Sequence, residues 1–179
     1  SDLNRPVRVT DELGTVTQYA YDTVGNLIEK VEAAGTISER VTRFAYDTYG
    51  NVTSVKGVGD SHTSDAEALM EYDLAGNLVS IQEPEGATTR FTHDSMGNVL
   101  TRTNHDGKVF THVYDAAGRI VSAANPLGHT TQWFYDAAGN RTQEIDPEGK
   151  IRTYHYDTHD RLTQWFDAAG NATVVYYNA

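Results

Sequence analysis

The stretch Tyr135-Asp136-Ala137-Ala138-Gly139-Asn140 decides the fold, because its pattern recurs along the whole chain. Tyrosine and aspartate stand together, glycine follows three residues after the aspartate, and asparagine or arginine comes next. The repeated structural motif is carried by Tyr21, Asp22, Gly25, Asn26, Tyr46, Asp47, Gly50, Asn51, Tyr72, Asp73, Gly76, Asn77, Asp94, Gly97, Asn98, Tyr114, Asp115, Gly118, Tyr135, Asp136, Gly139, Asn140, Tyr156 and Asp157. His93 takes the place of one tyrosine, and Asp160 takes the place of one glycine.

The motif has a fixed period. From Asp73 to Asp157 the motif aspartates are 21 residues apart. A constant period of this size is typical of repeat arrays, in which each unit packs on the next. We therefore predict that residues 1–179 form one array of about eight repeats. Residues 1–5 align with 157–161, and another copy begins at Tyr177, so we expect both ends to be cut within a repeat.

Each period contains a second turn, of which Asp146-Pro147-Glu148-Gly149 is the clearest copy. Aspartate can accept hydrogen bonds from the N–H groups ahead of it, proline presets φ, and glycine tolerates the left-handed conformation that ends the turn. Its counterparts are residues 11–14, 32–35, 83–86, 104–107, 125–128 and 167–170. About six residues separate successive turns, which is the length of a strand. The sequence predicts an all-β fold of tandem antiparallel hairpins.

The strands place aromatic side chains on one face. Trp133 and Tyr135 are two residues apart and therefore point to the same side of their strand, and the same two positions are mostly aromatic in the other repeats. Two aromatic and two aliphatic side chains cannot offset the conformational entropy of ordering one repeat, so each repeat needs its neighbours. About sixteen strands exceed the ~10 that open sheets usually hold, so we expect a twisted, spiralling sheet.

Two repeats are longer than the rest. Asp22 and Asp47 are 25 residues apart, and Asp47 and Asp73 are 26 apart. The first excess lies in residues 35–40 and is expected to lengthen a hairpin. The second lies near residues 57–70, where glycine and serine predict a surface loop that returns to a strand at 66–70.

Composition excludes several functions. The chain has 25 acidic and 14 basic residues, for a net charge of −11, which argues against binding nucleic acid or an anionic membrane surface. No apolar run is long enough to cross a membrane as a helix, so we expect no membrane insertion by this segment. There is no cysteine, so disulfides and thiolate metal sites are excluded.

The residues offer no catalytic site, metal site or cofactor site. The seven histidines do not have metal-ligand spacing, and His93 and His112 fall on the aromatic face, where packing explains them. The aspartates form a regular row, but each occupies the same turn position, so turn capping explains them better than acid–base chemistry. We therefore expect a protein that is not an enzyme.

The pattern Tyr-Asp-x-x-Gly-Asn/Arg followed by Leu, Val or Ile, at a spacing of 21 residues, resembles the YD repeat of the Rhs (rearrangement hotspot) family. Relatives include the C components of Tc toxins, polymorphic toxins and animal teneurins. The resemblance covers the whole chain and implies a segment of a β-shell that encloses a C-terminal toxin or effector domain in a secreted or cell-surface bacterial protein. Its partners would be the rest of its own array and that toxin polypeptide.

Two other functions stay open. Rows of tyrosine and tryptophan could stack on sugars, which would make the chain a carbohydrate- or protein-binding adhesion module. A teneurin-like adhesion shell is the second. A short piece of an array also leaves strand edges exposed, which favours edge-to-edge self-association.

Overall fold

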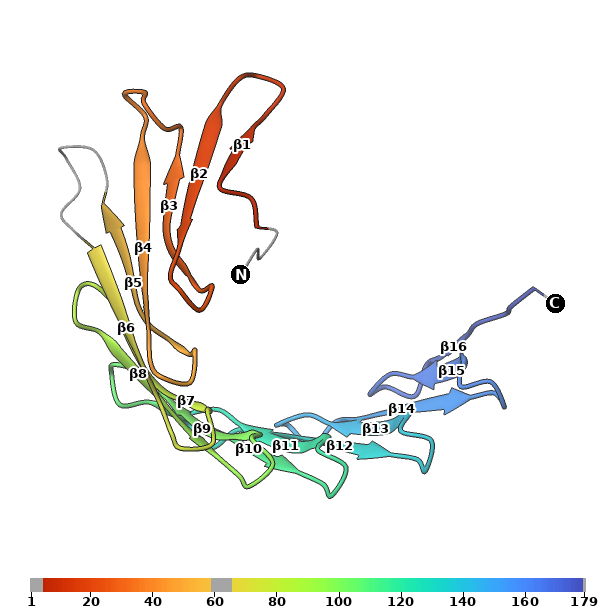
Figure 1. The fold of residues 1–179 in the computed structure, drawn as a ribbon. Helices are drawn as coiled ribbons and strands as arrows, with labels where there is room; N and C mark the ends of the chain where they lie inside the picture. Colours follow the sequence, from red (N-terminus) through yellow and green to blue (C-terminus); the bar gives the residue numbers. More distant parts are fainter. Residues whose placement is uncertain (1–4, 59–65, 179) are drawn as a thin grey trace. The chain divides into compact units, whose positions relative to one another are not determined.

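The computed structural model describes residues 5–58 and 66–178, and this part of the chain consists of strands and turns (Figure 1). The strands are β1 (Arg8–Thr10), β2 (Val16–Tyr21), β3 (Leu27–Glu32), β4 (Arg40–Tyr46), β5 (Val52–Val58), β6 (Ala66–Tyr72), β7 (Leu78–Gln82), β8 (Thr88–His93), β9 (Val99–Thr103), β10 (Val109–Tyr114), β11 (Ile120–Ala124), β12 (Thr130–Tyr135), β13 (Arg141–Ile145), β14 (Ile151–Tyr156), β15 (Leu162–Phe166) and β16 (Ala172–Val174). The order of the strands in the sheet is their order in the chain, and the sheet is not closed. The predicted all-β hairpin fold is therefore confirmed.

The chain divides into two compact units, residues 1–91 and 92–179. Within each unit, neighbouring strands pair antiparallel, and the described strands contact only the strands next to them in the sequence. Each unit is thus a single layer of sheet. In the described residues no apolar side chain is buried, and only the Ser80 side chain falls to 8% exposed. Stability comes from contacts along the sheet rather than from a core between layers, as the sequence predicts for a repeat array.

Alternation along the strands separates two faces. In β12 the side chains of Trp133 and Tyr135 are half-buried, while Phe134 between them is exposed. We call the side of the sheet that carries Tyr135 and its equivalents the motif face. The same alternation in β2, β8 and β10 places the predicted aromatic positions on the motif face. Because both faces lie open, the aromatic side chains of the motif face are partly buried rather than enclosed.

Hairpins that end in a motif turn share one irregularity. The pairing of β12 with β13 shifts between Phe134 and Tyr135, so that Tyr135 stands opposite Arg141. Equivalent shifts precede Tyr21, Tyr46, Tyr72, Tyr114 and Tyr156. Such a bulge bends the strand and turns a side chain to a new direction. Here it sets the direction of the motif tyrosine.

In the two longer repeats, the extra residues lie at the strand ends opposite the motif turns. Residues 33–39 join β3 to β4, and the turn closes with the N–H of Thr36 donating to the carbonyl of Ala33 (3.1 Å). Ala33 takes a left-handed φ of 52°, so the turn does not follow the pattern predicted for residues 32–35. Further along, β5 extends to Val58, where the sequence predicts a loop from residue 57, and β6 begins at Ala66. The rest of that predicted loop, 59–65, lies outside the described residues.

Candidate functional site: the junction between repeats

The motif turn is built around one carboxylate. Asp136 Oδ1 accepts a hydrogen bond from the N–H of Asn140 (2.8 Å), and the N–H of Asp136 donates to the carbonyl of Asn140 (2.9 Å). Gly139 has a φ of 99°, a left-handed conformation that side chains disfavour. The same bond to the N–H four residues on is made by Asp22, Asp47, Asp73, Asp94, Asp115 and Asp157. Asp160, which replaces glycine, also takes a left-handed φ of 59°.

The residue after the glycine holds the second carboxylate oxygen. Asn140 Nδ2 donates to Asp136 Oδ2 (3.2 Å), and the same bond is made by the asparagines of four other motif turns and by Asn171 in a second turn. Arg119 does so with two nitrogens, because its Nε and Nη2 each lie 2.7 Å from Asp115 Oδ2. Arg161 contacts Asp157 in the same way. Asparagine and arginine are therefore interchangeable inside the turn.

These hydrogen bonds keep the carboxylates ionised. The backbone N–H of Arg161 and then its side chain lower the pKa of Asp157 from 3.8 to about 2. Hydrogen bonds from the Arg119 side chain and backbone lower the pKa of Asp115. For Asp22, partial burial acts to raise the pKa. Hydrogen bonds from the backbone N–H groups of Asn26, Gly25 and Val24 and from the Asn26 side chain outweigh this effect, and the pKa is lowered. A general acid or base works best with a pKa near the working pH, so these carboxylates suit turn capping.

The motif tyrosine ties its repeat to the preceding one. Backbone pairing of β11 with β12 begins at Ala124 and stops at Ser122, which stands opposite Gln132. Past this point the Tyr135 hydroxyl donates a hydrogen bond to the Ile120 carbonyl (2.8 Å). The side chain thus bridges the two strands where their backbones no longer pair. Equivalent bonds, 2.8–3.1 Å long, join Tyr21 to Pro6, Tyr46 to Leu27, Tyr72 to Val52, Tyr114 to Val99, Tyr156 to Arg141 and Tyr177 to Leu162.

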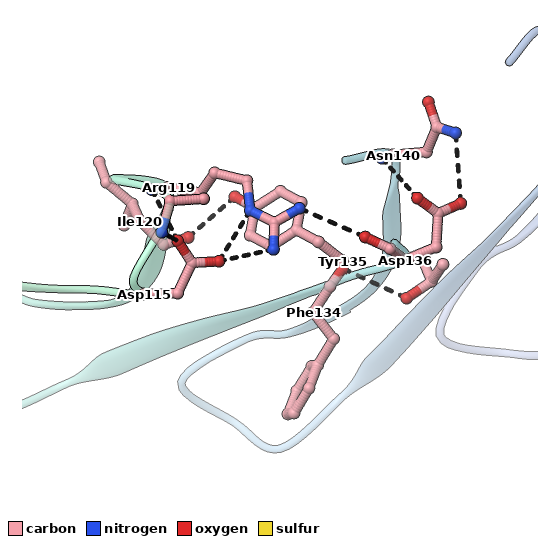
Figure 2. A network of polar contacts seen from close by, with 9 residues as sticks. Asp115, Arg119, Ile120, Phe134, Tyr135, Asp136 and Asn140 are labelled. Atoms are coloured by element: carbon pink, nitrogen blue, oxygen red, sulfur yellow. Dashed lines mark hydrogen bonds and ion pairs between the residues drawn. The ribbon is translucent and has the colours of Figure 1, made fainter. Parts of the chain in front are cut away.

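Arg119 shows how two motif turns are joined (Figure 2). Its guanidinium is paired with Asp115 in its own turn, lies 4.8 Å from the ring centre of Tyr135, and donates through Nη1 to the Asp136 carbonyl (3.3 Å). It also lies close to Gly139 of the next turn. The corresponding link from Asn140 runs to Asp160 Oδ1 (2.8 Å). The motif residues of consecutive repeats therefore meet where the strands end at the motif turns.

Sequence reasoning did not anticipate the arginine stacking. Arg5 lies over Tyr21, Arg119 over Tyr135 and Arg161 over Tyr177, with the guanidinium carbon 4.6–5.4 Å from the ring centre. The constant separation of 16 residues between arginine and tyrosine was a usable signal. Arg141, an exception among the aliphatic residues that follow the motif turn, stacks on Tyr154 and pairs with Glu144.

His93 occupies the tyrosine position and His112 the aromatic position two residues before a motif tyrosine. The Nδ1 atoms of both rings are buried and have no hydrogen-bond partner. His112 lies 6.4 Å from Tyr114, measured between ring centres. Residues 5–58 and 66–178 contain no group of three histidine, aspartate or glutamate side chains that could hold an ion. Nor does this part of the chain contain a helix long and apolar enough to span a membrane.

Comparison with known proteins identifies the family. Residues 1–37, 72–109 and 114–151 match the family model described as RHS Repeat. The chain belongs to the RHS repeat family. No curated protein matches this RHS repeat chain.

Several solved toxin structures share the fold of the RHS repeat chain. The Tc holotoxin pore of Photorhabdus luminescens, with a TccC3 variant, matches with a TM-score of 0.69 and 18% identity over 89% of this chain. TcdB2–TccC3 without its hypervariable C-terminal region gives 0.69 and 20% over 90%, and TcdB2–TccC3–Cdc42 gives 0.70 and 19% over 94%. The chain covers only 9%, 9% and 11% of those three chains, so the likeness concerns a segment of each.

Proposed function

We propose that this RHS repeat chain is a non-catalytic wall segment of a shell that encloses a C-terminal toxin or effector polypeptide in a secreted bacterial protein. In this proposal residues 1–179 are one array, and its partners are the rest of that array and the enclosed polypeptide. The fold shared with segments of Tc toxin chains supports this assignment.

The junction between repeats is the observation that carries the proposal. The motif carboxylates accept hydrogen bonds from their own turns, and the motif tyrosine hydroxyls donate to neighbouring strands. Groups that would otherwise be candidates for chemistry are thus engaged, the carboxylates in their own turns and the tyrosine hydroxyls in joining one repeat to the next. A single layer of sheet with each strand held to the next is what a wall requires, and the motif residues serve this structural role.

Limited proteolysis of the protein that carries this array tests the proposal. The C-terminal polypeptide should resist protease in the intact protein. Replacing Tyr135 and Tyr156 by alanine should open the wall and make that polypeptide cleavable. Tyr176, which is 89% exposed, supplies the matched control, because Tyr176→Ala removes an aromatic ring without a junction bond. Equal digestion of the C-terminal polypeptide in the intact protein and in the double variant would contradict enclosure.

The alternative is an adhesion module that binds carbohydrate or protein through aromatic side chains. Exposed rings such as Tyr49 and Phe134 favour it, since they lie free on the surface. A carbohydrate-binding module would show a higher melting temperature in millimolar sugar. An unchanged melting temperature across a sugar panel would leave the wall segment as the better assignment.

Association through strand edges belongs to the same proposal. Among the strands of residues 5–58 and 66–178, β1 pairs with β2 alone and β16 with β15 alone, so each of these two strands has one backbone edge without a partner strand. Free edges favour pairing with another strand. Light scattering of the chain should therefore show a mass that rises with concentration, and a constant monomer mass would contradict edge association.

A further inference from the structure

A groove lies between the first two motif turns, in the first unit. It has a volume of about 580 Å³ and is lined by Asp22, Asn26, Phe44, Tyr46, Asp47 and Tyr49, among others. Two aspartates contribute to its lining, and no lysine or arginine does. The pKa of Asp47 is lowered by hydrogen bonds from Asn51, so the groove carries negative charge at neutral pH.

At two other junctions the chain itself places a guanidinium beside the motif tyrosine. At the junction of the Asp115 and Asp136 turns, the Arg119 guanidinium stacks on Tyr135 and pairs with Asp115 (Figure 2). Its Nη1 also lies 3.6 Å from where a Cβ on Gly139 would stand. At the junction before the groove, Arg5 stacks on Tyr21 and packs against Gly25. Both arginines thus occupy the space between a motif tyrosine and the glycine of its turn.

That space is open beside Tyr46. The residue in the position of Arg119 is Asn26, whose side chain is bonded to its own Asp22 (3.0 Å). No atom lies within 4 Å of where a Cβ on Gly50 would stand, whereas Gly25 and Gly139 are covered by arginine. The exposed Val24 and Tyr49 side chains flank the opening. An aromatic ring, two carboxylates and an uncovered glycine remain where a guanidinium lies at the Arg5 and Arg119 junctions.

We propose that this groove binds an arginine side chain presented by a partner polypeptide. The guanidinium would lie over the Tyr46 ring and beside the Asp22 carboxylate, as that of Arg119 lies over Tyr135 beside Asp115. Arginine fits better than lysine because its planar group stacks on aromatic rings and donates several hydrogen bonds in one plane. The inference goes beyond the wall function and does not depend on it.

An NMR titration of the chain with the capped peptide acetyl-Gly-Arg-Gly-amide tests the site. Saturable shifts are expected at the amides of Asn26 and Gly50, with a dissociation constant in the roughly millimolar range for one stacked, paired side chain. Peptides with lysine or with neutral citrulline in place of arginine should bind about tenfold more weakly. Equal binding of the lysine peptide, or shifts spread evenly over the motif turns, would overturn the proposal. Tighter binding of free arginine than of the capped peptide would also overturn it.

The variant Asn26→Arg supplies the internal ligand and should abolish peptide binding. Asn98→Arg, in a motif turn of the second unit, is the matched control and should leave the shifts at Asn26 and Gly50 unchanged. A circular dichroism spectrum checks that both variants fold. Tyr49→Ala removes an exposed side chain that lines the groove and serves as a second test. This variant should bind the peptide severalfold more weakly. Undiminished binding in a folded Asn26→Arg protein, or in Tyr49→Ala, would contradict the assignment.

Discussion

The two compact units contain the same motif turns in different surroundings. In the second unit the motif aspartates keep a spacing of 21 residues, and two turns carry only alanines between aspartate and glycine, at 116–117 and 137–138. In the first unit the spacing grows to 25 and 26 residues, and the turns expose Val24, Tyr49 and Leu74. The hydrogen bonds of the turn are the same in both units.

This difference shows which parts of a repeat are constrained. The carboxylate, the left-handed glycine and the tyrosine hydroxyl determine the turn and its junction, whereas the middle positions of the turn hold side chains as different as alanine, valine, leucine and tyrosine. Added length goes to the other ends of the strands, as in residues 33–39. The repeats can vary there because those ends do not take part in the junction.

Acid should produce the largest difference in stability between motif turns of the two units. Because the folded-state pKa of the motif aspartates is lowered, their contribution to stability is complete above about pH 4 and is lost as the pH falls through the folded-state pKa. For Asp157, which pairs with Arg161, that pKa is about 2. The NMR amide signals of the Asp157 turn, in the second unit, should therefore keep their folded positions to lower pH than those of the Asp22 and Asp47 turns in the first. A change of all three turns at one pH, or no change down to about pH 2, would contradict the expectation.

Gly139→Val should have the next largest effect. A β-branched side chain resists the φ of 99°, and the variant should lower the free energy of unfolding by about 2 kcal/mol, measured by denaturant titration. Ala138→Val is the control, since the middle of the turn is exposed and tolerates valine at position 24. Similar stability of the two variants would show that the left-handed turn is not required.

Removing the hydroxyl of one motif tyrosine should cost about 1 kcal/mol, the usual value of one hydrogen bond. Tyr135→Phe in the second unit and Tyr46→Phe in the first lose the same type of bond, to Ile120 and Leu27. Comparable losses of thermal stability would show that the junction is equivalent in repeats of different length. A loss in only one unit would mean that the longer repeat relies on other contacts.

Arg119→Asn should have the smallest effect on stability, about 0.5–1 kcal/mol, because asparagine restores the bond within the turn, and what is lost is the stacking on Tyr135 and the long hydrogen bond to the Asp136 carbonyl. The same change should open a groove beside Tyr135 and create binding of the arginine peptide in the second unit. A folded Arg119→Asn protein that gains no binding would show that the first-unit groove has a feature of its own.

The sequence predicted the fold because its information is local. The turn residues repeat at a fixed interval, and each turn determines where two strands begin and end. The partner of the Tyr135 hydroxyl could not be predicted in this way, since Ile120 lies on another strand and the bond depends on where backbone pairing stops. Ala33 was also missed, because nothing in its neighbours signals a left-handed alanine.

The motif residues can be read from the repeat in the sequence, but the contacts that join them cannot. The guanidinium of Arg119 looks like surface charge in the sequence, and its stacking on Tyr135 follows only from the geometry of the junction. The groove beside Tyr46 was not predicted for the same reason. It lies where an arginine side chain stands at the Arg5 and Arg119 junctions, and this junction has no such arginine.

The neighbour-only pairing of the strands has a consequence for biosynthesis. Tyrosine hydroxyl bonds between strands join residues only 15 to 20 positions apart, and this separation does not grow as repeats are added. A nascent chain emerging from the ribosome can therefore dock each new hairpin onto the previous one without waiting for distant sequence, and low contact order favours rapid assembly. Translation itself can thus build an array of any length by one repeated elementary step.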